Sequence, residues 1–134
     1  MLLILTSTNP VPTSTKMAKY FKREEFACKC GCGTNEIVDQ FIEQLDDARA
    51  IAGVPFHITS GYRCPDHNKS VGGASESAHT SGMAADIAVT DSRTRFLILS
   101  GLIQAGFNRL GIAKTFIHAD MDPAKDPDVV WLYS

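Results

Sequence analysis

Two short motifs, well separated in the sequence, most constrain what this chain can fold into. The first runs from Ser77 to Asp86 and contains His79, and the second, at residues 116–120, contains His118. Two imidazoles and one carboxylate form the ligand set of a catalytic zinc ion that keeps one coordination position open for water. An unpaired carboxylate would be costly among the small and apolar neighbours of Asp86, and a metal ion would remove that cost. Taken singly, the three residues also fit a loop histidine, a capped turn and a core histidine.

The first motif, Ser77-x-His79-x-x-Gly82-x-Ala84-x-Asp86, resembles the zinc signature of the M15 peptidases. This family contains D-Ala-D-Ala carboxypeptidases, dipeptidases and phage endolysins, which share a hedgehog-type zinc fold. The resemblance extends over residues 20–134 and includes the segments 25–33, 58–65, 67–68, 71–74 and 130–133. It implies an α+β fold with a small antiparallel sheet flanked by helices, and one Zn²⁺ per chain with His79, Asp86 and His118 as ligands.

The group that would take a proton from water is the least defined part of this site. Related peptidases place a Glu or Asp three residues before the last ligand, or a His two residues before it. Thr115 and Phe116 occupy these positions here, and neither side chain can act as a base. Residues two apart on a strand face the same side, so we expect Asp120 to face the metal and act as the catalytic base. Glu76 and Asp122 are the alternatives, and Asp120 also fits a surface or turn carboxylate.

Arg63 is the second expected catalytic residue. By resemblance it binds the substrate and stabilises charge on the scissile carbonyl, a role that suits a permanently charged fork of hydrogen-bond donors. A structural salt bridge is the alternative. Ser77 is expected to brace the site or contact the substrate backbone, and Trp131 to line the cleft, although an aromatic residue in a final strand also fits a core position. His57 and His67 are not expected to be ligands.

The chain divides into a leader at residues 1–16 and one domain at residues 17–134. Residues 6–15 are mostly Ser, Thr and Pro, so we expect an extended or disordered leader; a short arm against the domain is the alternative. Apolar spacing predicts a helix that begins at Glu36, with Asn35 as its cap, and ends at Gly53. A second helix is expected to be capped by Asp91 or Ser92 and to end at Gly106, and a helical turn is expected at 65–70. Strands are expected at 56–60, 84–89, 107–113, 115–120 and 129–133, with a hairpin turn at Lys114.

The charge and the hydropathy of the chain limit the classes of partner that it is expected to bind. The 134 residues carry a formal net charge of −2, which gives no electrostatic case for binding nucleic acid or an anionic membrane. No apolar run approaches the roughly 20 residues of a membrane helix, and the apolar start is too short for a signal peptide. Together with the resemblance, this predicts a monomer made in the cytoplasm without a signal peptide. It would act on peptidoglycan stem peptides at the bacterial cell wall or periplasm.

The four cysteines have three alternative states. Cys28, Cys30 and Cys32 alternate along the chain, and Cys64 stands beside Arg63. A four-cysteine zinc site is conceivable, but C-x-C-x-C gives poor reach for tetrahedral closure compared with paired C-x-x-C knuckles. A disulfide between Cys64 and one of the other three cysteines can form if the protein works outside the cytosol. Simple buried thiols are the expected state where the protein is made.

The function implied by the resemblance is that of a zinc-dependent peptidase acting on the peptidoglycan stem peptide. Two activities stay open. An endolysin-like endopeptidase would cut L-alanyl-D-glutamate or a cross-bridge, and a carboxypeptidase would remove terminal D-alanine. The alternative from another class is a zinc-stabilised, catalytically inactive hedgehog-like binding module, which the missing Glu or His before His118 favours. A structural component of a phage tail with the same fold is a third interpretation.

Overall fold

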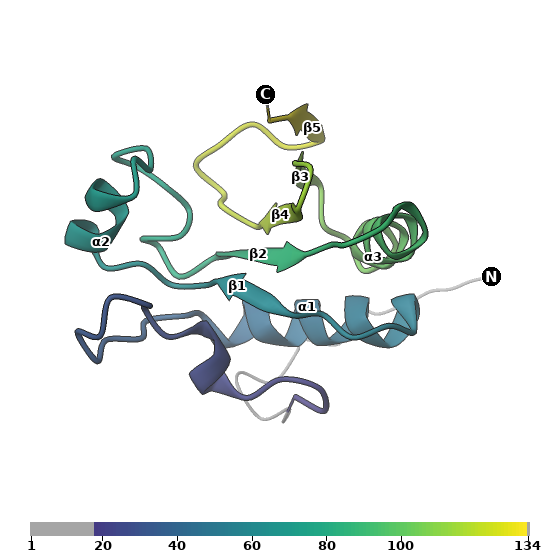
Figure 1. Ribbon diagram of the computed structural model, residues 1–134, viewed down its shortest axis with the longest axis horizontal. Coiled ribbons are helices and arrows are strands. Elements are labelled where there is room, and N and C mark those ends of the chain that lie inside the picture. The colour runs from purple at the N-terminus through teal and green to yellow at the C-terminus, as the bar shows by residue number, and fades with distance from the viewer. Residues whose placement is uncertain (1–17, 134) are drawn as a thin grey trace.

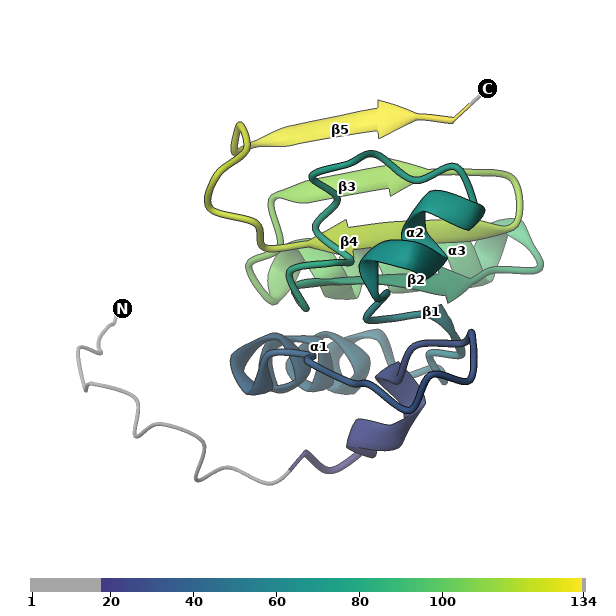
Figure 2. The same ribbon diagram turned by 90° about the vertical axis from the view of Figure 1, so that its left-hand side faces the viewer.

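A computed structural model describes residues 18–133, so the expected leader at residues 1–16 lies outside the description. The elements are the 3₁₀ helix η2 (Arg23–Phe26), α1 (Asp39–Ala52), β1 (Ile58–Ser60), α2 (Pro65–Ser70), β2 (Ala84–Ala88), α3 (Ser92–Gln104), β3 (Arg109–Ile112), β4 (Phe116–Asp120) and β5 (Val129–Leu132). The strands form one sheet in the order β1-β2-β4-β3-β5, with α2 before one face and α3 behind the other (Figure 1 and Figure 2). This confirms the expected α+β class. None of the helices within residues 18–133 is long and apolar enough to cross a membrane.

Strands β2 and β4 give the sheet one apolar and one polar face. Ala85, Ile87, Ile117 and Ala119 are fully buried in the hydrophobic core. The residues between them point to the opposite face, because side chains alternate along a strand. The antiparallel register of β2 and β4 pairs Asp86 directly with His118, so residues 32 positions apart become cross-strand neighbours.

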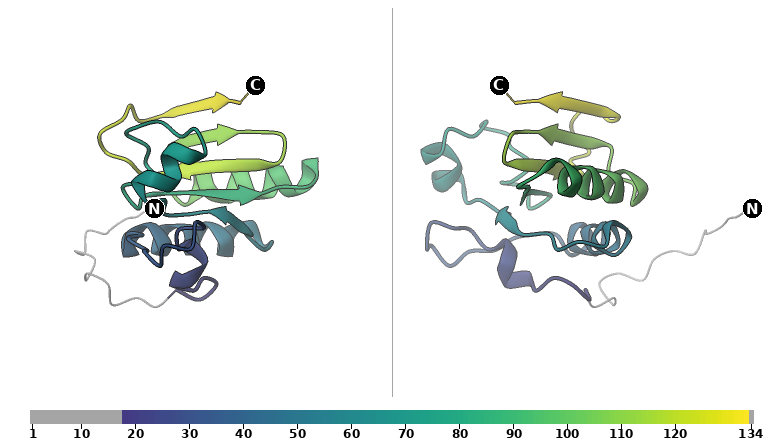
Figure 3. Two further views of the ribbon diagram at one scale, coloured as in Figure 1. Left: turned by 60° about the vertical axis from the view of Figure 1, so that its left-hand side comes forward. Right: turned by 45° about the vertical axis from the view of Figure 1, so that its right-hand side comes forward.

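Helices α1 and α3 lie side by side and cover the apolar face (Figure 3). Gly101 permits this close approach, because a Cβ atom there would lie 2.5 Å from the carbonyl oxygen of Ala48. Asp91 caps α3 as expected, since its Oδ1 accepts a hydrogen bond of 2.8 Å from the backbone N–H of Thr94. Gly53 ends α1 in the left-handed conformation, with φ of 72°.

The start of α1 differs from the prediction by three residues. Asn35 does not cap the helix: its side chain donates to the carbonyl of Arg23 at 2.8 Å. The following backbone stays extended and runs beside Gly82, whose carbonyl accepts a 2.8 Å hydrogen bond from the N–H of Val38. This tertiary contact outweighs the local capping signal and delays the helix to Asp39.

The expectation of a wholly antiparallel sheet is wrong at one edge. β5 pairs with β3 in parallel and places Trp131 opposite Gly111. The segment between β4 and β5 returns the chain to the start of β3, where the N–H of Val129 donates to the carbonyl of Asn108 at 3.0 Å (Figure 1). Because of this crossover, β5 lies beside β3 and extends the polar face of the sheet.

Replacement of Gly82 should test the contact between the start of α1 and the site loop. Gly82 and Gly53 have nearly the same φ, 73° and 72°, but an added Cβ would meet nothing at Gly53 and would overlap the Glu36 carbonyl oxygen at Gly82. We expect Gly53→Ala to lower the free energy of unfolding by about 1 kcal/mol and Gly82→Ala by about 3 kcal/mol. Urea denaturation of the two variants measures the difference, and equal losses would contradict the close packing at Gly82.

Candidate metal centre

Three buried side chains from three different segments meet on the polar face of the sheet. His79 comes from the turn before β2, Asp86 from the middle of β2 and His118 from the middle of β4. Their exposed fractions are 3%, 8% and 7%. Asp86 Oδ1 lies 3.4 Å from His79 Nε2 and 3.0 Å from His118 Nδ1. The structure therefore brings together the three ligands expected from the sequence.

These separations fit a zinc ion. Zinc binds His nitrogen and carboxylate oxygen at about 2.0–2.1 Å, and two corners of such a tetrahedron lie about 3.3 Å apart. The two measured separations, 3.0 and 3.4 Å, lie close to that value. One donor atom from each residue lies within 4.8 Å of the other two. Three protein ligands leave the fourth corner open, as in catalytic zinc sites.

The orientation of His79 is set by its backbone surroundings. Its Nδ1 lies 2.7 Å from the carbonyl oxygen of Gly61. A carbonyl can only accept, so Nδ1 carries the hydrogen and Nε2 is presented to Asp86. The N–H of His79 donates to Ser77 Oγ at 3.1 Å, and the His79 carbonyl accepts from the N–H of Arg63 at 3.1 Å. Ser77 thus braces the loop that carries His79, one of its two expected roles.

Asp86 and His118 shift one another's pKa values. Burial opposes ionisation of Asp86, but hydrogen bonds from His118 and His79 outweigh it and hold the pKa of this carboxyl below its ordinary value. Burial also disfavours the charged form of His118, yet its hydrogen bonds to Asp120 and Asp86 raise the pKa of the imidazole. The two carboxylates therefore stabilise the positively charged form of the His118 imidazole that lies between them.

Asp120 lies on the same side of β4 as His118, as expected, but on the far side of the imidazole from Asp86. Its Oδ2 is 2.7 Å from His118 Nε2. Its Oδ1 accepts hydrogen bonds from Arg109 Nε at 2.7 Å and from the N–H of Asp122 at 3.1 Å. Burial acts against ionisation, but the contact with His118 dominates and lowers the pKa of Asp120. Both oxygens are thus engaged, and a carboxylate so placed orients a ligating histidine.

Neither alternative base belongs to the group of metal-ligating side chains. Asp122 is buried and forms an ion pair of 2.6 Å with Lys125 Nζ. Glu76 is exposed, and its backbone carbonyl accepts a hydrogen bond of 2.5 Å from the same ammonium group. Lys125 therefore ties these two segments together across the mouth of the site.

Arg63 is held from two sides beside Asp86. Its Nε donates to Ser60 Oγ at 3.1 Å and its Nη1 to Asn68 Oδ1 at 3.1 Å, while Nη2 lies 3.5 Å from Asp86 Oδ2. Asn68 is buried and also donates to the carbonyl of Ala74 at 2.7 Å. The guanidinium is consequently fixed next to the metal ligands, in a position compatible with both the substrate-binding role and the salt-bridge alternative.

A cleft of about 390 Å³ opens over the metal ligands and is lined by Arg63, Trp131 and Tyr133 among others. The indole of Trp131 packs 5.5 Å from the His118 ring, measured between centroids. It reaches this place because Gly111 has no side chain: a Cβ there would lie 2.5 Å from Trp131 Nε1. Trp131 therefore forms part of the cleft wall, as expected.

The sequence did not identify three supporting residues, Arg109, Lys125 and Asn68. Arg109 contacts Asp120 from the neighbouring strand and also lies over the Trp131 ring, 5.2 Å from its centroid. The sequence did contain a signal for Arg109, because the expected hairpin turn at Lys114 brings Arg109 opposite Asp120. The resemblance included Asn68 but assigned it no role, and no local pattern marked Lys125, whose ammonium group contacts the distant Glu76 carbonyl.

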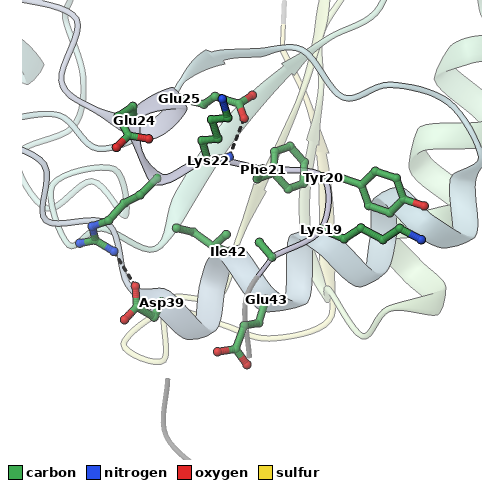
Figure 4. A pocket seen from close by; sticks show the side chains of 11 residues that line it. Lys19, Tyr20, Phe21, Lys22, Glu24, Glu25, Asp39, Ile42 and Glu43 are labelled. Atoms are coloured by element: carbon green, nitrogen blue, oxygen red, sulfur yellow. Dashed lines mark hydrogen bonds and ion pairs between the residues drawn. The ribbon is translucent and has the colours of Figure 1, made fainter. Parts of the chain in front are cut away.

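A larger hollow of about 670 Å³ lies between residues 18–25 and α1 (Figure 4). The described residues that line it include no His or Cys. Its charged groups are partly paired, as the 2.6 Å contact between Arg23 and Asp39 shows. We place the site in the smaller cleft and not in this hollow, because His79, Asp86 and His118 converge beneath the cleft. Of the remaining histidines, His57 is exposed and His67 is half-buried on α2.

Comparison with known proteins agrees with this geometry. The sequence model of the family described as Peptidase M15 matches residues 19–120, which include the three candidate ligands, Arg63 and Asp120. No curated protein matches the chain. The family match covers more than half of the 134 residues. The chain therefore belongs to the M15 peptidase family.

Proposed function

We propose that this protein is a zinc-dependent peptidase that hydrolyses peptide bonds in the peptidoglycan stem peptide. The observation that carries the proposal is the convergence of His79 and His118 on Asp86 Oδ1, at 3.4 and 3.0 Å, beneath an open cleft. When bound, zinc supplies Lewis-acid chemistry: it polarises a carbonyl group and lowers the pKa of water. Membership of a peptidase family makes an amide the natural target.

Arg63 is the residue best placed to hold the substrate. Ser60 and Asn68 fix its Nε and Nη1, so binding a substrate oxygen costs little additional side-chain ordering. The cleft also contains Arg109 and Lys125. Stem peptides offer D-glutamate and terminal D-alanine carboxylates, which such cationic groups bind. This complementarity supports the stem peptide as the substrate class, with action at the cell wall or periplasm.

Asp120 is better placed to position His118 than to accept a proton. A base needs an oxygen directed at the reacting water, but both oxygens of Asp120 are engaged by His118, Arg109 and a backbone N–H. By holding Nε2–H, Asp120 keeps Nδ1 of His118 aimed at Asp86. Within residues 18–133, no carboxylate at the ligands is disengaged, and this observation favours the alternative, an inactive zinc-stabilised binding module.

Digestion of purified peptidoglycan tests the proposal directly. The zinc-loaded protein should release peptides, a chelator should abolish release, and added zinc should restore it. Mass analysis of the products distinguishes cleavage at L-Ala-D-Glu, at a cross-bridge or at terminal D-alanine. Intact peptidoglycan after incubation with protein of verified zinc content would overturn the peptidase proposal and favour the binding module.

Zinc content should depend on His118 and not on His57. His118→Ala removes one corner of the ligand set, so the purified variant should contain one equivalent of zinc less than the parent. His57→Ala, at an exposed position outside the cleft, is the matched control and should keep the parent value. Because protons compete for ligand nitrogens, zinc affinity should also fall as pH decreases. Metal analysis by mass spectrometry measures both, and full retention in His118→Ala would remove His118 from the ligand set.

Arg63→Lys should fold and bind zinc but lose activity. An ammonium group cannot reproduce the contacts of a planar guanidinium with Ser60, Asn68 and a substrate oxygen at once. We expect kcat/KM for a stem peptide to fall about 10²-fold. Arg93→Lys, at an exposed position near the start of α3, is the control and should behave as the parent. Near-parental turnover in Arg63→Lys would mean that Arg63 serves only as a structural salt bridge.

Asp120→Asn separates positioning from base catalysis. If Asp120 orients His118, the variant should bind zinc about 10–100-fold more weakly than the parent, with a matching loss of activity at limiting zinc. If Asp120 is the base, zinc affinity should stay unchanged while kcat falls about 10²–10⁴-fold. Competition with a chelator gives the affinity, and turnover at saturating zinc gives kcat. The geometry predicts the first result.

A further inference from the structure

The four cysteines converge on a second group of side chains, separate from the cleft. Cys28, Cys30 and Cys32 lie on the loop after η2, and Cys64 is the residue that caps α2. All four Sγ atoms lie within 4.8 Å of one another. No disulfide joins any of these cysteines, all of which lie within the described residues.

The sulfur spacing matches metal coordination. Cys28 Sγ lies 3.4 Å from Cys30 Sγ, and Cys30 Sγ lies 3.7 Å from Cys64 Sγ. Zinc binds thiolates at about 2.3 Å, which places two sulfur corners of a tetrahedron about 3.8 Å apart. A disulfide needs about 2.05 Å, so neither pair is bonded. These two separations are close to those of a tetrahedral metal site, and the other sulfur pairs lie within 4.8 Å.

Two glycines explain how closely spaced cysteines reach a common centre. Gly31 and Gly33 have φ values of 87° and 81°, which other residues rarely adopt. These left-handed residues curl the loop, and the N–H of Cys28 closes it by donating to the Thr34 carbonyl at 3.1 Å. The poor reach expected for C-x-C-x-C is therefore overcome by the backbone conformation.

Burial does not account for the cluster. Cys30 and Cys32 are exposed and only Cys28 is fully buried, contrary to the expectation of buried thiols. Exposed thiols gain little from meeting one another, and four thiolates at this distance would repel. A divalent cation would remove the repulsion. Backbone N–H groups already approach two sulfurs: Cys64 N lies 3.3 Å from Cys28 Sγ, and His67 N lies 3.4 Å from Cys64 Sγ. Such donors stabilise thiolate ligands.

We propose that Cys28, Cys30, Cys32 and Cys64 bind a second zinc ion, whose role is structural. Four protein ligands close the coordination sphere, as in structural zinc sites, and leave no position for water. The protein would then hold two zinc ions, one more than the resemblance implies.

This second ion would fix the turn on which the catalytic cleft depends. The loop at 28–32 and the turn at 61–64 belong to separate parts of the sequence. They are also joined by the N–H of Tyr62, which donates to the Phe26 carbonyl at 2.8 Å, and by the tight packing of Gly61 on Phe26. In addition, Cys64 N lies 3.3 Å from Cys28 Sγ. The turn supplies the Gly61 carbonyl that orients His79 and carries Arg63 next to Cys64. A zinc ion bound to Cys64 would thus hold the Gly61 carbonyl and the Arg63 side chain in place.

Titration of the metal-free, reduced protein with Co²⁺ tests the second site. The parent should bind two equivalents and develop strong near-ultraviolet absorption from sulfur-to-cobalt charge transfer, which the His–Asp centre cannot produce. Cys30→Ser should lose one equivalent and most of this absorption, and its thermal midpoint should fall. His118→Ala should lose the other equivalent and keep the sulfur band. Because each variant loses a different equivalent of Co²⁺, loss of the cysteine site can be distinguished from loss of the His–Asp site.

Two measurements overturn the proposal even if Cys30→Ser does not fold. The first is the absence of sulfur-to-cobalt absorption in the parent at saturating Co²⁺. The second is the thiol count of protein purified without reductant, denatured in the presence of a chelator. Four reactive thiols agree with metal ligation, whereas two or fewer would show that the cysteines pair as disulfides instead.

Discussion

The buried carboxylate of Asp86 is the group around which the rest of the structure is arranged. A charge taken out of water costs several kcal/mol unless partners compensate it. Here the partners come from three places: His118 from the neighbouring strand, His79 from the preceding turn and Arg63 from the end of β1. The sheet must keep its register for His118 to lie opposite Asp86. The same interaction therefore specifies strand pairing and assembles the site.

Much of this arrangement follows from local patterns in the sequence. Helix α2 and the bounds of β2 and β4 lie within a residue of expectation, because turn residues and alternation mark them clearly. The resemblance to the M15 family was also evident, since most of its motif residues fall within short segments such as 77–86. Asp86 and His118 were expected together as metal ligands through the family resemblance, and the register of β2 and β4 then places them opposite each other. These signals are short in range and do not depend on how distant segments pack.

Features set by distant contacts were not predictable in the same way. Asn35 has the chemistry of a helix cap, but the contact between Val38 and Gly82 decides where α1 begins. The parallel pairing of β5 depends on a crossover that no spacing rule distinguishes from a hairpin. Asp120 was expected on the correct side of β4, but its contact with Arg109 was missed, because that contact joins two strands; the hairpin turn at Lys114 was the signal that could have found it. The cysteine cluster likewise depends on two left-handed glycines whose conformation the spacing alone does not reveal.

The packing of Trp131 over Gly111 has a consequence for which substitutions this protein can accept. The cleft wall occupies the space that a side chain at position 111 would fill. A larger residue at 111 would require a smaller or displaced residue at 131, and the neighbouring face of His118 would open to solvent. The two positions thus constrain each other's substitution, although one lies on an inner strand and the other on the edge. A change in the width of the cleft would therefore require paired replacements at positions 111 and 131, and the metal ligands would stay the same.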